Sequence, residues 1–316
     1  MGTDEQISSV SPEKIRRIRL FCDVAEANGS HLSLKELIAL VSLDVSESKL
    51  SKDWSMFDEL QGYEIDSGYA VSKDDADNDF EAIKREESDR LSRANWRLAF
   101  SLRFAELCSR VGVKVISVSG STSYLSVARD DDLDFFCIMN VDSLWPSLAK
   151  FLLLARVFRI VHEDSPLICL SYVADEAFAL REFTSPQDGL FARDAIYVRV
   201  LRGRKYYARL LKSSTWMAGY FPRMYCERVK EAEGKITVKS SSAAGRIANL
   251  FVYLTVGRYI KIKSFLLNRR YAKERMQASL FRVRMGRDHC IYESTRYLDL
   301  KHMYSCMDDG ERRVDE

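Results

Sequence analysis

The chain has 316 residues and a net charge of +2, with 47% hydrophobic and 30% charged residues, a composition typical of a globular protein with room for two or three domains. Its seven cysteines are scattered without a Cys-x-x-Cys pair, which excludes a disulfide framework and a zinc site of that type. The N-terminus is polar and the longest apolar run, 247–256, is too short to cross a bilayer, so we expect a cytoplasmic protein with no membrane partner.

The charge is distributed unevenly along the chain. Lys and Arg against Asp and Glu number 8 to 17 in residues 1–80, 15 to 17 in residues 81–199 and 25 to 12 in residues 200–316, which gives −9, −2 and +13. We therefore expect any polyanionic substrate to meet the C-terminal part of the chain.

The first 75 residues predict three helices and a hairpin. Ser11-Pro12-Glu13 is a helix start, Ser33 and Glu36 form a capping box, and a third helix begins near Ser46. Alternating residues on both sides of Asp66-Ser67-Gly68 indicate a hairpin. This order resembles a winged helix-turn-helix, but the charge of −9 disfavours DNA binding and favours a packing or protein-docking module.

Residues 72–79 are predicted to be a linker, and residues 80–111 a long helix. The apolar stripe of this helix is expected to consist of Leu91, Leu98, Leu102 and Ala105, broadened by Trp96, Phe100 and Phe104. Most of its arginines are expected to face solvent.

A strand, a turn, a short helix and a second strand follow between residues 113 and 139. The first strand ends at Gly120, which permits a sharp turn and a close approach of a ligand to the backbone. Ser121 then begins the helix, where free backbone N–H groups and its hydroxyl can bind a phosphate. Asp132 and Asp134 begin the second strand and point to the same face of it. Two carboxylates near a phosphate seat predict a divalent-metal site.

Gly120-Ser121, followed eleven positions later by Asp132-x-Asp134 at the start of an apolar strand, resembles the signature of the DNA polymerase beta-like nucleotidyltransferase superfamily. The resemblance implies that the Gly-Ser turn holds a nucleoside triphosphate, with ATP as the expected nucleotide, and that the two aspartates bind Mg²⁺ or Mn²⁺. Arg129, just before the acids, is either a phosphate-neutralising residue or a counter-ion for its acidic neighbours.

The resemblance extends to a little-characterised nucleotidyltransferase family in which a winged-helix-like N-terminus precedes the catalytic domain. The matching pieces are 168–172, 188–199, 206–216 and 221–222. Ser171 and Ser214 stand where the family pattern has Asn, and Leu125 where these turns often carry Gly. Active superfamily members carry a third carboxylate on the later strand, and residues 167–174 contain none. Asp175, Glu176 and Glu182 follow, and the sequence leaves open whether one of them completes the site.

From Gln187 onward the chain is predicted to be mainly helical and basic. Tyr206 and Tyr207 lie among five Lys and Arg residues between 202 and 212; they suit either base stacking and phosphate contact or an amphipathic helix with core-capping tyrosines. A long helix is expected over 240–271. Residues 281–285 alternate as a strand does, although a helix is the other interpretation.

We therefore predict an α+β fold: a winged-helix-like module (1–75), a small mixed-sheet nucleotidyltransferase core (76–186), a helical basic region (187–306) and a charged tail (307–316). The predicted function is metal-dependent transfer of a nucleoside monophosphate to RNA, protein or a small molecule, with release of pyrophosphate. The alternatives are a nucleotide-binding regulatory protein without transferase activity and a winged-helix transcription regulator. The acceptor is expected at the basic C-terminal region.

Overall fold

A computed structural model describes residues 10–73, 80–108, 112–162, 164–230, 232–238, 242–276 and 280–311. Most of the predicted linker 72–79 and residues 312–316 of the predicted tail therefore lie outside the described residues. No helix within the described ranges is long and apolar enough to cross a membrane.

The N-terminal module contains the three helices and the hairpin in the predicted order. Its elements are α1 (Pro12–Ala27), β1 (Leu32–Ser33), α2 (Leu34–Val41), α3 (Glu47–Asp53), the 3-10 turns η1 (Trp54–Met56) and η2 (Asp58–Leu60), β2 (Tyr63–Asp66) and β3 (Tyr69–Ser72). Ser11 caps α1, and Ser33 with Glu36 forms the capping box of α2. The strands form an antiparallel sheet in the order β1-β3-β2. Its identity as a winged helix stays a prediction.

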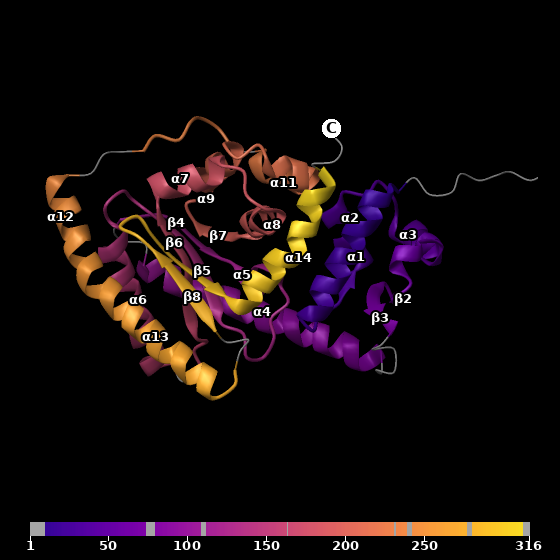
Figure 1. Cartoon of the computed structure of the whole chain (residues 1–316), viewed down its shortest axis with the longest axis horizontal. Helices are drawn as coiled ribbons and strands as arrows, with labels where there is room; N and C mark the ends of the chain where they lie inside the picture. Colours follow the sequence, from indigo (N-terminus) through magenta and orange to yellow (C-terminus); the bar gives the residue numbers. More distant parts are fainter. Residues whose placement is uncertain are drawn as a thin grey trace, which may run out of the picture.

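The core of the protein is a six-stranded mixed sheet in the order β7-β4-β5-β6-β9-β8 (Figure 1). Its strands are β4 (Val113–Val118), β5 (Leu133–Met139), β6 (Ile168–Asp175), β7 (Arg199–Arg202), β8 (Phe281–Met285) and β9 (His289–Ser294). Strands β5 and β6 are parallel, and the other neighbours are antiparallel. The coarse α+β prediction is confirmed by this mixture of helices and mixed sheet.

Helices cover both faces of this sheet. The remaining elements are α4 (Phe80–Cys108), α5 (Gly120–Tyr124), α6 (Leu144–Val161), α7 (Glu176–Thr184), α8 (Gly189–Tyr197), α9 (Arg204–Lys212), α10 (Met217–Tyr220), α11 (Pro222–Val229), α12 (Ala243–Val252), the π-helical turn η4 (Tyr253–Gly257), α13 (Arg258–Lys273) and α14 (Thr295–Glu311). Along β5, Phe135 and Cys137 pack with α4 and α6, whereas Phe136 and Ile138 pack with α7, α8 and α9.

The C-terminal region differs from the predicted helical unit in three ways. Strands β7, β8 and β9 belong to it and supply half of the central sheet, so it is not separate from the core. The predicted helix 240–271 is two helices joined by η4. Residues 307–311 of the predicted tail continue α14.

The buried face of α4 matches the predicted apolar stripe only in part. Leu91 and Leu102 are exposed, whereas Arg90, Arg97 and Ser101 are buried. The prediction is confirmed for Phe104 and Ala105, which are buried, and for Leu98 and Phe100, which pack against the core. It is wrong for Leu91, Leu102 and Trp96, whose side chains face away from the sheet.

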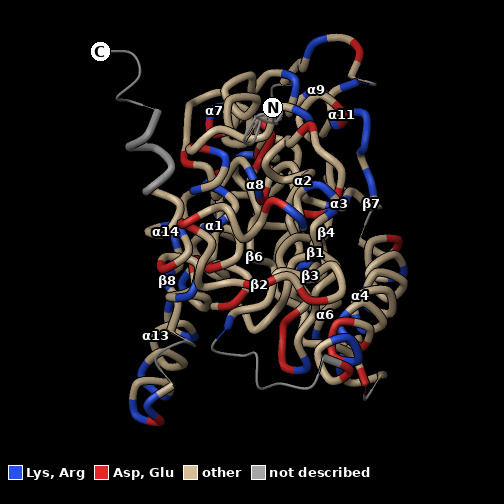
Figure 2. The backbone as a smooth tube through the Cα atoms, turned by 90° about the vertical axis from the view of Figure 1, so that its right-hand side faces the viewer, with Lys and Arg blue, Asp and Glu red and all other residues tan. Residues whose placement is uncertain are grey.

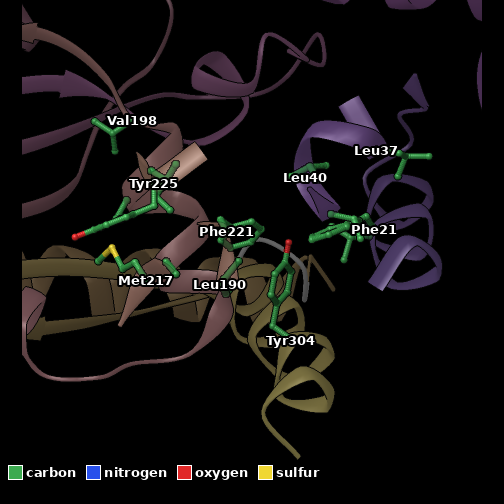
Figure 3. Close-up of a cluster of buried hydrophobic side chains, with 14 of the residues drawn as sticks. Phe21, Leu37, Leu40, Leu190, Val198, Met217, Phe221, Tyr225 and Tyr304 are labelled. Carbon is green, nitrogen blue, oxygen red and sulfur yellow. The ribbon is translucent and has the colours of Figure 1, made fainter. Parts of the chain in front are cut away.

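The N-terminal module packs directly on the helical layer of the core. Helix α14 runs beside α1 (Figures 1 and 2). The ring of Phe21 lies 6.2 Å from that of Phe221 and 6.1 Å from that of Tyr304 (Figure 3). Leu37 belongs to the same buried cluster. Packing is therefore one role of this module, as its sequence indicated.

Candidate active site

The turn after β4 lies directly against the side chain of Asp134. Gly120 has φ of +60°, and a Cβ atom at this position would lie 2.7 Å from Asp134 Oδ2. The backbone N–H of Ser119 donates to the carbonyl oxygen of Asp134 at 3.0 Å, which fixes the turn to β5. Only glycine combines this backbone conformation with this approach. The structure thus brings Gly120 and Asp134 together.

Several polar groups gather in the turn and in α5. The Ser123 hydroxyl donates to the carbonyl oxygen of Gly120 at 2.8 Å and holds the turn closed. Ser121 is half-buried in the first turn of α5, where backbone N–H groups have no intrahelical acceptor. The hydroxyls of Thr122 and Ser126 are buried without a hydrogen-bond partner among the described residues. Buried polar groups normally have partners, so these donors are suited to a polar ligand.

Asp132 and Asp134 lie two residues apart at the start of β5 and are half-buried. Burial, reinforced by the negative charge of Asp132, raises the pKa of Asp134 to about 7. Burial also raises the pKa of Asp132, against the opposing effect of Arg97. Carboxylates that are costly to ionise beside one another are stabilised by a bound cation, because the cation restores the favourable charge balance.

Arg97 is a site residue that the sequence analysis did not identify. Its guanidinium is buried and donates to the carbonyl oxygen of Asp132 at 2.9 Å. Burial lowers the pKa of Arg97, and the charges of Asp132 and Asp134 oppose that effect. The signal was present in the spacing of Arg90, Ala94 and Arg97, which places all three on one helix face. Arg97 thus lies among the acids as a fixed positive charge.

Arg129, which was predicted to neutralise phosphate or acidic neighbours, is exposed. Within the described ranges it forms no ion pair with either aspartate. Its predicted contact with phosphate stays a prediction, and its counter-ion role is not supported by an ion pair.

The three acids considered as a third ligand lie elsewhere. Asp134 pairs with Cys169 across β5 and β6, whereas Asp175 pairs with Met139, five residues further along the strand and roughly 17 Å away at the strand rise of about 3.3 Å per residue. Asp175 caps α7 by accepting from two backbone N–H groups. The open question is answered: Asp175 is at the far end of the sheet from Asp134.

Glu176 and Glu182 are also engaged away from the aspartate pair. Glu176 is buried and lies 3.5 Å from the ammonium of Lys114. Glu182 accepts from the Tyr172 hydroxyl at 2.6 Å and from Arg284 at 2.7 Å. Neither carboxylate is positioned to complete the site.

The position on β6 opposite Asp134 is occupied by a thiol. Cys169 is half-buried and hydrogen-bonds with the carboxylate of Asp134. Two residues further along β6, the hydroxyl of Ser171 lies 3.3 Å from that of Ser119 and donates to the Phe135 carbonyl oxygen at 3.2 Å. Cys169 and Ser171 therefore place a thiol and a hydroxyl on β6 beside the start of β5.

The donor set fits a hard divalent cation that is only partly held by protein. Among the residues that the structure describes, no three His, Cys, Asp or Glu side chains are arranged to hold a metal ion by themselves. Mg²⁺ is commonly bound by one or two carboxylates together with water and substrate phosphates. Asp132 and Asp134 match the carboxylate part of that requirement.

The tyrosine pair of α9 is divided between the two predicted roles. Tyr207 is buried and donates its hydroxyl to the carbonyl oxygen of Ala195 at 2.6 Å, so it is a core residue. Tyr206 is partly buried, and its hydroxyl has no hydrogen-bond partner within the described part of the chain. The core-capping interpretation therefore holds for Tyr207.

Comparison of the chain with protein-family models, with curated proteins and with solved structures found no match.

Proposed function

We propose that this protein binds a nucleoside triphosphate together with Mg²⁺ or Mn²⁺ and transfers the nucleoside monophosphate to an acceptor hydroxyl, releasing pyrophosphate. The observation that carries the proposal is the direct approach of the Gly120 turn to Asp134, with no side chain between them. This approach brings the Gly120-Ser121 turn and the carboxylate pair together, which supports a single site for phosphate and cation. The presence of both motifs in the sequence alone did not guarantee such proximity.

Each residue has a distinct role in this proposal. Gly120 and Ser121 contact the β- and γ-phosphates through backbone N–H groups and a hydroxyl. Asp132 and Asp134 hold the cation, which would polarise the α-phosphate and neutralise the pyrophosphate that leaves. Arg97 holds the Asp132 backbone through its hydrogen bond and moderates repulsion within the acidic turn. Catalysis of this kind depends mainly on positioning and charge.

The acceptor is expected along the basic C-terminal part of the chain, whose net charge is +13 over residues 200–316. This charge favours an anionic acceptor such as RNA over a neutral one. Protein and small-molecule acceptors remain outcomes of the experiment below.

A second candidate function is a nucleotide sensor that binds metal and nucleotide without transferring the nucleotidyl group. The observation in its favour is Cys169 at the position opposite Asp134, because a thiol in place of a third carboxylate leaves the general base for the acceptor hydroxyl unassigned. Replacing Cys169 with Asp separates the two candidates: a sensor gains transfer activity, whereas a transferase is already active without the change.

The proposal is tested with ATP labelled on the α-phosphate, offered with Mg²⁺ or Mn²⁺ to the protein, total RNA and lysate proteins. The test variant carries Asp132→Asn and Asp134→Asn, and the matched control carries Asp130→Asn, an exposed aspartate in the preceding turn. Label in RNA, protein or a small molecule that the test variant loses and the control keeps supports the transferase. Binding without transfer supports the sensor, and absence of both contradicts the site.

A further inference from the structure

Helices α12 and α13 carry an exposed apolar ridge on the side that faces away from the sheet. We define the ridge as Ile247, Phe251, Leu254, Ile262, Phe265 and Leu266. Each of these side chains is between 47% and 69% exposed. Single exposed apolar residues are ordinary, but six large ones on two consecutive helices are typical of an interaction surface.

The ridge faces outward because the opposite face of both helices is fixed to the core. Asn249 accepts from the backbone N–H of Trp145 at 2.9 Å and donates to the carbonyl oxygen of Arg287 at 3.0 Å. Gly257 and Ile260 are buried on the same side. Residues 247–266 span roughly 30 Å at the helical rise of about 1.5 Å per residue. The ridge therefore cannot turn inward without breaking these contacts.

The charge of the two helices selects the kind of surface that the ridge can meet. Residues 243–276 contain eight Lys and Arg and a single acid, Glu274. Arg258, Lys261 and Lys263 are exposed and lie within or beside the ridge. A second copy of this chain would place the same positive surface against itself, which costs free energy, whereas an anionic surface is complementary.

The shape of this region favours a flat partner over a groove-binding one. Helices α12 and α13 form the outer edge of the molecule at the left of Figure 1, and α13 projects from the body at the lower left of Figure 2, with Lys and Arg along it. A projecting helix with outward Phe, Leu and Ile flanked by Lys and Arg has the features of helices that lie in a membrane interface. Lys and Arg stems can follow apolar groups while their charged ends reach headgroups.

We propose that the α12–α13 ridge lies on an anionic phospholipid bilayer, with the apolar row inserted at the headgroup boundary and the flanking cations against lipid phosphates. The sequence-based expectation of no membrane partner rested on the lack of a segment that could cross a bilayer, and a helix that lies on the surface needs no such segment. This inference is independent of the proposed nucleotide site.

The test is co-sedimentation of the full chain with two kinds of vesicle: phosphatidylcholine alone, and phosphatidylcholine mixed equally with phosphatidylglycerol. We expect at least about tenfold tighter binding to the anionic vesicles, weakened by added salt. A variant with Phe251→Ser and Phe265→Ser should bind at least about tenfold more weakly, because two aromatic insertions are lost. The matched control is Met56→Ser, an equally exposed apolar residue on η1, and should bind as the unaltered protein does.

The ridge residues are exposed, so circular dichroism should show the same fold for both variants. Equal binding of the Phe variant and the unaltered protein overturns the proposal, as does failure to bind either vesicle. A dimer in light scattering that the Phe variant dissociates also overturns it, because the ridge would then join two copies of the chain. Loss of nucleotide transfer has no bearing on this measurement.

Discussion

The carboxylates at the two ends of strands β5 and β6 differ in their partners. At one end, Asp175 accepts from the N–H groups at the start of α7, at 3.0 and 2.8 Å, and Glu176 lies beside Lys114. At the other end, Asp132 and Asp134 form no ion pair with a Lys or Arg side chain of the described residues. The first pair of acids holds the fold together, and the second pair is available to a cation. The two pairs of acids therefore differ in their partners: a helix cap or a Lys side chain holds each acid of the first pair, and no Lys or Arg ion pair among the described residues holds the second.

Removing the second pair should give the largest functional effect. We expect the Asp132→Asn and Asp134→Asn variant to lose metal-dependent nucleotide binding and transfer by at least about 100-fold, because the proposed cation site loses both of its carboxylates. Calorimetric titration with ATP and Mg²⁺ measures this. Glu176→Gln at the other end should leave the titration unchanged; equal loss in both variants would contradict the distinction between the two ends.

A methyl group at the turn should disturb the same site without removing a charge. Gly120→Ala must hold φ near +60° and place its Cβ 2.7 Å from Asp134 Oδ2, so we expect at least about tenfold weaker nucleotide binding and a loss of roughly 2–3 kcal/mol in stability. The matched control is Gly68→Ala, where φ is +90° and an added Cβ would have no neighbouring side chain or backbone atom within 4 Å. It should lose only about 1 kcal/mol of stability in urea unfolding.

Breaking the contact between Glu176 and Lys114 should lower stability and leave nucleotide binding unchanged. Glu176→Gln leaves Lys114 without its buried partner, and we expect a loss of about 1–3 kcal/mol in the free energy of unfolding. Urea unfolding measures this loss, and Lys114→Met in the same background tests whether the two effects overlap. Independent, additive losses would show that the 3.5 Å contact contributes nothing.

The smallest expected effect is a pH dependence of stability that arises from Asp134. The pKa of Asp134 is about 7 in the folded protein against an ordinary value of 3.8. Its contribution to stability is therefore complete below about pH 3.8 and is lost as the pH rises through 7. With metal chelated, the melting temperature of Asp134→Asn should exceed that of the unaltered protein by an amount that grows between about pH 4 and pH 7. A pH-independent difference would contradict the raised pKa.

The sequence predicted the central elements well because their signals are local. Gly120 indicates the turn, β-branched residues indicate β4, the apolar run after Asp132 indicates β5, and Pro166 marks the break before β6. The contact of Arg97 with the acidic turn and the distance of Asp175 from Asp134 were not predictable in this way. The first depends on where α4 crosses a loop far away in sequence, and the second on the register between β5 and β6, which no local pattern of residues specifies.

The order of strands also constrains how this chain can be made. Strand β6 lies beside β5 and is covered on its other edge by β9, through pairs such as Tyr172 with Ile291. During synthesis β6 emerges more than a hundred residues before β9 (residue 175 against residue 289). Until β9 arrives, β6 has an unpaired edge of the kind that joins neighbouring chains into aggregates. The nascent chain must therefore protect this edge, or delay the closure of the sheet, until its last strands leave the ribosome.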